Sequence, residues 1–337
     1  MSVFAFIVLC FDGRDGLRYI TSDCGAESDV FINHHYTNTP EESVQQILAA
    51  GTDSDCGGFM GEHLQSALDK KLVVEADLDA RLKMLFRVRM RLGHFDPLGP
   101  LDKIPASAIC DEAAIATARD SVAQSVTLVK NADKTLPLSN ATVKSVAVIG
   151  PSAKQPWSIT SYYGPSSSCD GKYWTMVDAV QQYVNDTKYF AGLDATLSTN
   201  YSGIAAAAAL AKTTDAVVLC VGTDLTSAHE EMDAVNITFP AAQWALVQAV
   251  AAAAAKPITV VIMTAVPLDI SEVLALENVG AVIHAGQPSV QTLGIGDVIF
   301  GEKVPAGRLI QTVYPEAYAA EVSIFGASSW LARQAAA

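Results

Sequence analysis

The sequence predicts an α/β protein with a mostly parallel sheet. Four short, unbroken apolar runs predict strands that are buried on both faces: 146–150, 216–222, 258–263 and 279–284. Tens of residues separate the first three runs, and alanine-rich segments at 204–211 and 241–255 predict helices between them, because alanine has the highest helix propensity. Strands that alternate with helices in this way are typical of parallel βαβ units.

The first 96 residues predict a smaller α/β unit. An apolar strand is expected at 19–22, followed by helices near 39–49, 61–72 and 75–92. In the last of these helices, Leu78, Leu82, Leu85 and Phe86 form an apolar stripe, and basic residues such as Arg81 fall mostly off it, which indicates a solvated face. Proline and glycine punctuate residues 95–100, which predicts a linker.

Composition excludes several classes of function. The chain has 337 residues, which is enough for two domains or one barrel-sized domain, and its formal net charge is -14. Such an acidic chain is a poor partner for nucleic acid or an anionic membrane, whereas a neutral ligand such as a sugar meets no electrostatic penalty. No charge-free apolar run reaches 18 residues, so we expect no membrane span.

The sequence offers no support for a metal or a cofactor. Its six cysteines lack C-x-x-C spacing, which argues against a structural zinc site. Gly150 and Gly222 follow apolar runs without completing a G-x-G-x-x-G motif or a phosphate-binding loop, so a nucleotide-binding α/β protein is disfavoured. We regard His94 and His284 as structural histidines rather than metal ligands.

Glycosylation motifs point toward secretion. Four N-x-[ST] sequons, at Asn140, Asn185, Asn200 and Asn236, would be modified in a secretory pathway. The apolar run 3–10 has no basic residues before it and no A-x-A site after it, so we predict no signal peptide.

Two groups of carboxylates are candidates for chemistry. Asp23 ends the expected strand 19–22, and α/β enzymes place acidic side chains at such strand ends; a turn-forming aspartate is the alternative. A second group follows the run 216–222 within ten residues: Asp224, His229, Glu230, Glu231 and Asp233. Glycoside hydrolysis requires such a pair of carboxyl groups, one as nucleophile or base and one as proton donor. A solvated run of charges is the alternative for the second group.

Several segments resemble glycoside hydrolase family 3, in family order over roughly residues 17 to 315: 19–26, 50–57, 88–96, 127–131, 135–138, 148–151, 297–301 and 305–309. The Asp-Cys pairs at Asp23 and Asp55 make the chain most similar to the β-xylosidase branch of that family, whose members often also cleave arabinofuranosides. The resemblance implies a chain that lacks both ends of a full member.

The resemblance also implies a domain organisation. Residues 1–96 are expected to be the C-terminal remnant of a (β/α)8 barrel that carries the nucleophile. A linker and a first helix follow at 97–120, an α/β sandwich domain at 121–320, and an atypical tail at 321–337.

The family's catalytic roles map onto residues of this sequence. Asp23 matches the nucleophile, and Glu230 matches the acid/base, which partial burial and like charge are expected to keep protonated. The acid/base loop departs from the family pattern at Ala228, Glu231 and Ala234. Asp55, Glu231 and Asp224 are further candidates for substrate binding.

The implied function is retaining exo-hydrolysis of terminal β-xylosyl or α-arabinofuranosyl residues of xylo-oligosaccharides, in xylan catabolism by a secreted glycoprotein, without a cofactor. A catalytically inactive fragment that binds carbohydrate or serves as an interaction module is the alternative. Within the resemblance, Cys24 and Cys56 each follow an aspartate at the end of neighbouring barrel elements, which predicts a disulfide in an oxidising compartment. Two buried free thiols are the alternative.

Overall fold

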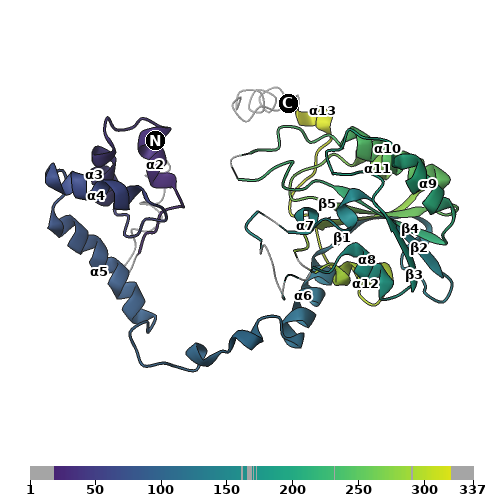
Figure 1. Cartoon of the computed structure of the whole chain (residues 1–337), viewed down its shortest axis with the longest axis horizontal. Helices are drawn as coiled ribbons and strands as arrows, with labels where there is room; N and C mark the ends of the chain where they lie inside the picture. The colour runs from purple at the N-terminus through teal and green to yellow at the C-terminus, as the bar shows by residue number, and fades with distance from the viewer. Residues whose placement is uncertain are drawn as a thin grey trace, which may run out of the picture. The chain divides into compact units, whose positions relative to one another are not determined.

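The computed structural model describes residues 19–160, 162–164, 169, 171, 173–230, 232–289 and 291–319. The chain divides into two compact units, Met1–Pro105 and Ala106–Ala337 (Figure 1). We call them the first and the second unit and describe each by itself.

The first unit consists mainly of helices. They are α2 (Ala26–Ile32), α3 (Pro40–Ala50), α4 (Phe59–Asp69) and α5 (Glu75–Arg91), followed by the 3-10 turn η1 (Leu101–Lys103). The three helices that the sequence predicts are confirmed to within a few residues, and α2 was not expected. Local signals explain α3: Thr39 Oγ1 accepts the backbone N–H of Glu42 at 3.2 Å, Pro40 occupies the first helical position, and Gly51 ends the helix with φ of +107°.

Residues 19–22 do not form the strand that we predicted from the sequence. Thr21 and Ser54 form a single parallel bridge, in which the backbone N–H of Ser22 donates to the carbonyl of Ser54 at 3.0 Å. A ladder needs longer paired segments than these two short runs supply. The bridge nevertheless brings the residues that precede Asp23 and Asp55 side by side.

The core of the first unit lies between α3 and α4. Its buried residues are Val44, Ile47, Leu48, Phe59, Ala67 and Val73. Helix α5 has no buried residue, and Leu82 and Phe86 of its predicted apolar stripe are 45% and 40% exposed. The helix is therefore predicted correctly, but only part of its apolar stripe is covered in this unit: Leu78 packs against the core, whereas Leu82 and Phe86 remain exposed.

The second unit is built on a six-stranded sheet. Its strands are β1 (Thr127–Asn131), β2 (Ser145–Ile149), β3 (Asp186–Phe190), β4 (Ala216–Gly222), β5 (Ile258–Met263) and β6 (Val279–Gly286). The spatial order is β1-β6-β5-β4-β2-β3, and all neighbours are parallel except β1 and β6. The four predicted strands are confirmed as the centre of the sheet, and both edge strands are additions to the prediction.

Helices cover both faces of the sheet (Figure 1). On one face lie α9 (Ile204–Lys212), α10 (Ala241–Ala253) and α11 (Ser271–Ala275), and on the other lie α6 (Glu112–Ser125), α8 (Met176–Gln181) and α12 (Leu293–Ile299). Strand β2 shows the consequence: Val146 and Val148 belong to the apolar cluster with α6, α8 and α12, whereas Ala147 and Ile149 belong to the cluster with α9, α10 and α11. Alternate residues of a strand point to opposite faces, so a strand buried on both faces is apolar throughout.

Short elements complete the second unit: η2 (Ala106–Ala108), η3 (Ala132–Lys134), η4 (Pro151–Ala153), α7 (Pro156–Ile159) and α13 (Glu316–Ala319). A disulfide joins Cys110 to Cys169, with 5.4 Å between the two Cα atoms. The sequence did not predict this bridge. It ties the segment before α6 to a loop that follows α7.

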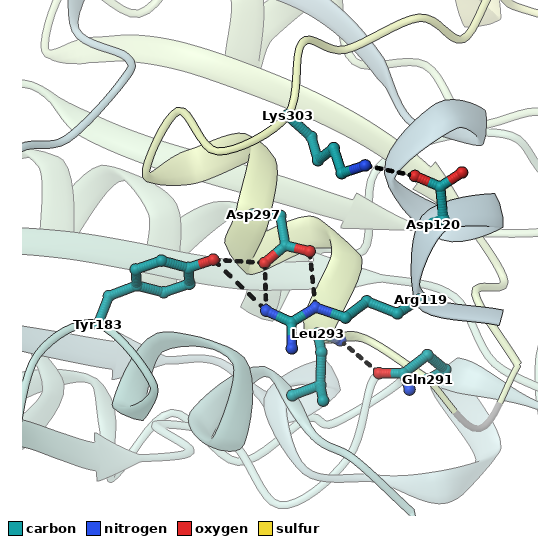
Figure 2. A network of polar contacts seen from close by, with 7 residues as sticks. All are labelled: Arg119, Asp120, Tyr183, Gln291, Leu293, Asp297 and Lys303. Carbon is teal, nitrogen blue, oxygen red and sulfur yellow. Dashed lines mark hydrogen bonds and ion pairs between the residues drawn. The ribbon is translucent and has the colours of Figure 1, made fainter. Parts of the chain in front are cut away.

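An ion pair between the half-buried guanidinium of Arg119 and the buried carboxylate of Asp297 fastens α6 to α12 (Figure 2). The Arg119 guanidinium donates to both carboxylate oxygens of Asp297, at 2.7 Å from Nε and 2.5 Å from Nη2, and the Tyr183 hydroxyl also donates to this carboxylate. Burial raises the pKa of Asp297, but the hydrogen bonds from Arg119 and Tyr183 outweigh it and leave the pKa below its ordinary value. Asp297 opens one of the segments that resemble family 3, and its observed contacts are structural.

Candidate active site

Asp23 lies in a tightly held turn of the first unit, residues 22–26, which we call the Asp23 turn. The backbone N–H of Gly25 donates to the carbonyl of Cys56 at 2.7 Å, and the backbone N–H of Cys56 donates to Ser22 Oγ at 2.8 Å. Gly25 has φ of +81°, a conformation that favours glycine. The side chain of Asp23 is exposed, and one of its oxygens accepts the backbone N–H of Cys24 at 2.7 Å. The fold therefore presents this carboxylate on a fixed backbone.

A disulfide reinforces the Asp23 turn. Cys24 and Cys56 are bonded, with 4.4 Å between their Cα atoms, which lies within the range that disulfides span. The bond joins the residue after Asp23 to the residue after Asp55. The two Asp-Cys pairs of the sequence are thus held against one another.

Asp55 and a residue that the sequence did not single out, Glu27, lie beside this turn. Asp55 Oδ2 accepts the backbone N–H of Met60 at 3.0 Å, near the start of α4. Glu27, in the first turn of α2, is 4% exposed. Burial, and to a smaller extent the neighbouring Asp55 carboxylate, raises the pKa of Glu27. No pattern in the sequence indicates that these two carboxyl groups are neighbours, because they are 28 positions apart and each is ordinary by itself.

Asp53 holds the chain that leads into the Asp23 turn. It is buried; its Oδ2 accepts the backbone N–H of Ile20 at 2.8 Å, and its Oδ1 lies 3.3 Å from Arg81 Nη1 of α5. The expectation that Arg81 belongs to a solvated face is therefore wrong. Its guanidinium pairs with a carboxylate that burial would otherwise leave uncompensated.

In the second unit, the loop after β4 (residues 223–240, called here the β4 loop) carries the second group of carboxylates. A buried glutamine holds its base: Gln243 of α10 accepts the backbone N–H of Gly222 at 2.8 Å and donates to the carbonyls of Gly222 and Thr196, each at 2.7 Å. Gly222 has φ of +142°, and a Cβ atom there would lie 1.9 Å from the Met263 carbonyl oxygen. The chain can leave the sheet at this point only with glycine.

Asp224 is buried at the start of the β4 loop. Its Oδ1 accepts the backbone N–H of Thr226 at 2.9 Å and the Thr226 hydroxyl at 2.5 Å. These local bonds are those of an aspartate that forms a turn. Asp224 also lines a pocket. It therefore both stabilises the turn and forms part of the pocket wall.

Glu230 lies at the tip of a small hairpin. His229 and Met232 exchange two backbone hydrogen bonds, each of 3.0 Å, and the His229 ring donates from Nδ1 to the Glu230 carbonyl. The Tyr162 ring stacks on His229, with 5.6 Å between the ring centroids. Glu230 is exposed, so the second unit by itself does not supply the partial burial that we expected. Glu231 lies outside the described residues.

A pocket of about 320 Å³ opens beside the hairpin, at the small end of the size range of ligand sites. Its lining residues are Tyr162, Tyr163, Thr223, Asp224, Leu225, Ala228, His229, Met232, Asp233, Ala234, Ala265, Val266 and Gln287. The pocket combines two tyrosine rings with carboxylates and an amide. Such a mixture suits a neutral polar ligand with apolar faces.

The histidines and the remaining acidic residues form no metal site in the part of the chain that is described. No group of three or more metal-binding side chains occurs among those residues. The ring of His94 contacts Arg89 and Phe95 at an exposed position, and burial lowers the pKa of His284. Within the same described ranges, no helix is both long enough and apolar enough to cross a membrane.

A mostly parallel sheet with helices on both faces, and a polar loop and pocket at the end of β4, define the second unit as an α/β domain of the class that binds ligands at this edge of the sheet. Residues 126–328 match the family model described as "Glycosyl hydrolase family 3 C-terminal domain". The chain belongs to glycoside hydrolase family 3.

Curated relatives support this assignment. "Probable beta-D-xylosidase 7" of Arabidopsis thaliana is 39% identical over 305 residues, covering 89% of this chain and 39% of the relative. "Beta-xylosidase/alpha-L-arabinofuranosidase 1" of Medicago sativa subsp. varia is 33% identical over 308 residues, covering 90% of this chain and 39% of the relative. The chain thus spans well under half the length of the curated relatives it matches.

A solved structure of similar sequence shows the same fold. It is a GH3 exo-beta-xylosidase in complex with a xylobiose aziridine activity-based probe, is 31% identical, and matches with a TM-score of 0.83 over 91% of this chain and 39% of that chain. A beta-glucosidase from Listeria innocua in complex with isofagomine, at 22% identity and a TM-score of 0.72 over 85% of this chain and 39% of that chain, shares the fold alone.

Proposed function

We propose that this chain supplies the nucleophile and the acid/base of a retaining exo-glycosidase that releases terminal β-xylosyl residues from xylo-oligosaccharides. The observation that carries the proposal is the exposed carboxylate of Asp23, held on a turn that a disulfide and three hydrogen bonds to residues 54–56 fix in place. The relatives also support the proposal, because proteins named as β-xylosidases are similar to about nine tenths of this chain.

The proposed reaction has two displacements. In the first, Asp23 attacks the anomeric carbon and forms a glycosyl ester, while Glu230 donates its proton to the departing glycosidic oxygen. In the second, Glu230 removes a proton from water, the water oxygen attacks the anomeric carbon, and the bond to Asp23 breaks. The sugar leaves with its original anomeric configuration. Retaining chemistry requires the two carboxyl groups to be about 5–5.5 Å apart in the reacting complex.

The arabinofuranosyl specificity and the secreted location belong to the same proposal. The name of the Medicago sativa relative, which includes α-L-arabinofuranosidase, supports the first. Two disulfides and four sequons support the second, because disulfides persist in oxidising compartments. Asp224, which borders the pocket, and Glu231 remain our candidates for contacts with sugar hydroxyls.

The experiment compares release of nitrophenol from a nitrophenyl β-xyloside by the chain and by its Asp23→Asn variant. Asp79, an exposed aspartate of α5 in the same unit, provides the matched control Asp79→Asn. We expect Asp23→Asn to lower release to background and Asp79→Asn to leave it unchanged. Equal release from the chain and from Asp23→Asn rejects Asp23 as the nucleophile.

The second candidate function is carbohydrate binding without turnover. The composition of the β4 loop favours it, because Ala228 and Ala234 replace charged residues of the family's acid/base segment. Calorimetric titration with xylose and xylobiose distinguishes the two: heat of binding without nitrophenol release supports this candidate, and the absence of heat rejects it.

A further inference from the structure

Three carboxylate oxygens among the described residues of the first unit are shielded from solvent and have no hydrogen-bond partner: Glu27 Oε2, Asp53 Oδ1 and Asp55 Oδ1. Asp53 Oδ1 lies 3.3 Å from Arg81 Nη1, which leaves Glu27 Oε2 and Asp55 Oδ1 without an ion-pair partner among these residues. Glu27 follows the Asp23 turn directly, in the first turn of α2, and Asp55 precedes Cys56, the disulfide partner of Cys24. An unsatisfied buried oxygen costs free energy, so two of them beside the same turn call for a physical explanation.

The two carboxyl groups interact with each other. Burial raises the pKa of Glu27 most, and the neighbouring Asp55 carboxyl group raises it to a smaller extent. Two carboxylates in contact cannot both carry a charge at low cost, and a single shared proton satisfies both. No ion pair to Glu27 occurs among the described residues. The other titratable groups nearby are Asp23 and Asp29, which flank Glu27 in sequence, and Glu62 and His63 of α4, which line a pocket with Asp55.

The shared proton would complete a chain of hydrogen bonds around Asp23. The backbone N–H of Cys56 donates to Ser22 Oγ at 2.8 Å, and the Ser22 side chain lies near the Glu27 carboxyl group, where it opposes part of the rise in the Glu27 pKa. At the other end, Asp55 Oδ2 accepts the backbone N–H of Met60 at 3.0 Å. The missing link between these two ends is a donor between Glu27 and Asp55.

We propose that Glu27 is protonated in the folded chain and donates that proton to Asp55, which makes Glu27 a positioning residue for Asp23. The neutral Glu27 joins the residue before Asp23 to the start of α4. The role of Asp23 as nucleophile rests on the proposed function, whereas the shared proton does not. Asp55 in this arrangement supports the turn through both of its oxygens.

The proposal predicts that the Asp23 turn becomes less stable as pH rises. A carboxyl group that binds its proton more tightly in the folded than in the unfolded chain stabilises the fold at acid pH, and this contribution is lost as pH rises through the folded-state pKa. Between the unfolded and folded pKa values, the local opening equilibrium of the turn should increase by up to about tenfold per pH unit. Opening frees Asp23 from its fixed backbone.

The test measures hydrogen exchange of the Gly25 and Cys56 amides by NMR on the full chain between pH 4 and 8, after correction for intrinsic exchange. In the unmodified chain we expect protection to fall as pH rises. Glu27→Gln keeps a donor toward Asp55 but cannot ionise, so its protection should be independent of pH and at least equal to that of the chain at pH 4. His63→Gln replaces the imidazole that lines a pocket with Asp55 and should leave the fall in protection unchanged.

A matched control comes from Glu41, which is 7% exposed in the same unit but pairs with Lys70 Nζ at 2.7 Å. Glu41→Gln should leave the pH dependence at Gly25 and Cys56 as it is in the unmodified chain. Protection that falls with pH equally in the chain and in Glu27→Gln overturns the proposal. If Glu27→Gln does not fold, the 13C titration of the Glu27 carboxyl group decides, and a midpoint at or below that of an exposed glutamate contradicts the shared proton.

The two proposals fail separately. Nitrophenol release that survives Asp23→Asn rejects the nucleophile and leaves the exchange result valid. Background release from Asp23→Asn, together with exchange that does not respond to Glu27→Gln, rejects the shared proton alone. Where the chain is active, Glu27→Gln should remove the fall of kcat at alkaline pH that opening of the turn produces, while KM stays within about twofold, because Glu27 itself does not touch the sugar.

Discussion

Cys24 and Cys56 are bonded to each other, so the residue after Asp23 is covalently attached to the residue after Asp55. The same two segments share the Thr21–Ser54 bridge and the hydrogen bond from Gly25 to Cys56. An exposed carboxylate thus sits on a backbone with little freedom. Such preorganisation is what a nucleophile needs if attack is to require no further ordering of the protein.

Removal of this disulfide should destabilise the first unit. The bond closes a loop with a sequence separation of 32, and the double substitution Cys24→Ser/Cys56→Ser should cost about 3–4 kcal/mol in the chain-entropy account. Hydrogen exchange of the amides in α3 and α4 measures this loss. The control pair Cys110→Ser/Cys169→Ser should leave those amides unchanged, and an equal effect of both pairs would contradict this prediction.

The ion pair between Arg119 and Asp297 should dominate the electrostatic stability of the second unit (Figure 2). Asp297→Ala leaves the half-buried guanidinium without its partner and should cost about 3–5 kcal/mol. Asp120→Ala, which breaks the exposed pair with Lys303, should cost less than about 1 kcal/mol. All four tryptophans lie in Ala106–Ala337, so urea unfolding followed by tryptophan fluorescence reports on this unit. Similar costs for the two variants would refute the ranking.

The amide of Gln243 should be essential to the base of the β4 loop. Gln243→Leu leaves three buried backbone groups of Gly222 and Thr196 without partners, and should cost about 3 kcal/mol or more. Gln248, an exposed glutamine of the same helix, gives the control Gln248→Leu, which should change stability by less than about 0.5 kcal/mol. Urea midpoints of the two variants settle the point, and a small effect at Gln243 would show that the base of the loop can rearrange.

Glu41 should give the first unit a stability that is lost in acid. Hydrogen bonds from Lys70 and then Ser66 lower the pKa of Glu41 from 4.5 to about 2. Because the folded value lies below the unfolded one, the stabilisation is complete above about pH 4.5 and disappears as pH falls toward 2. Hydrogen exchange of α3 amides between pH 5 and 2.5 measures it. Lys70→Met should reduce this loss of protection at low pH. An unchanged loss would exclude Lys70 as the cause of the lowered Glu41 pKa.

The central strands of the sheet could be predicted because burial on both faces forces an unbroken apolar run, as at Ile258–Met263. The edge strands β1 and β3 carry polar residues such as Lys130 and Asp186, since part of each edge strand is open to water, and they gave no such run. Helix α2 is only seven residues long and carries two carboxylates in its first turn, so its apolar period was too short to recognise.

The candidate site was predictable only in part. Asp23 stood out because a carboxylate ended an apolar run, and the resemblance to family 3 then supplied its proposed role. The proposed sharing of a proton by Glu27 and Asp55, the observed pairing of Arg81 with Asp53 and the hydrogen bonds of Gln243 all involve residues distant in the sequence. No local pattern predicts such contacts, because charged and amide side chains of these types usually lie on the solvated surface.

Covalent trapping tests the central claim, attack by Asp23 on the anomeric carbon, most directly. The chain is incubated with a xylobiose aziridine activity-based probe, the type of compound bound in the solved exo-beta-xylosidase, and is then digested and mapped by mass spectrometry. We predict one probe molecule on the peptide that contains Asp23, and none on that peptide in Asp23→Asn. Labelling of a different carboxylate, with Asp23 unmodified, would contradict the account.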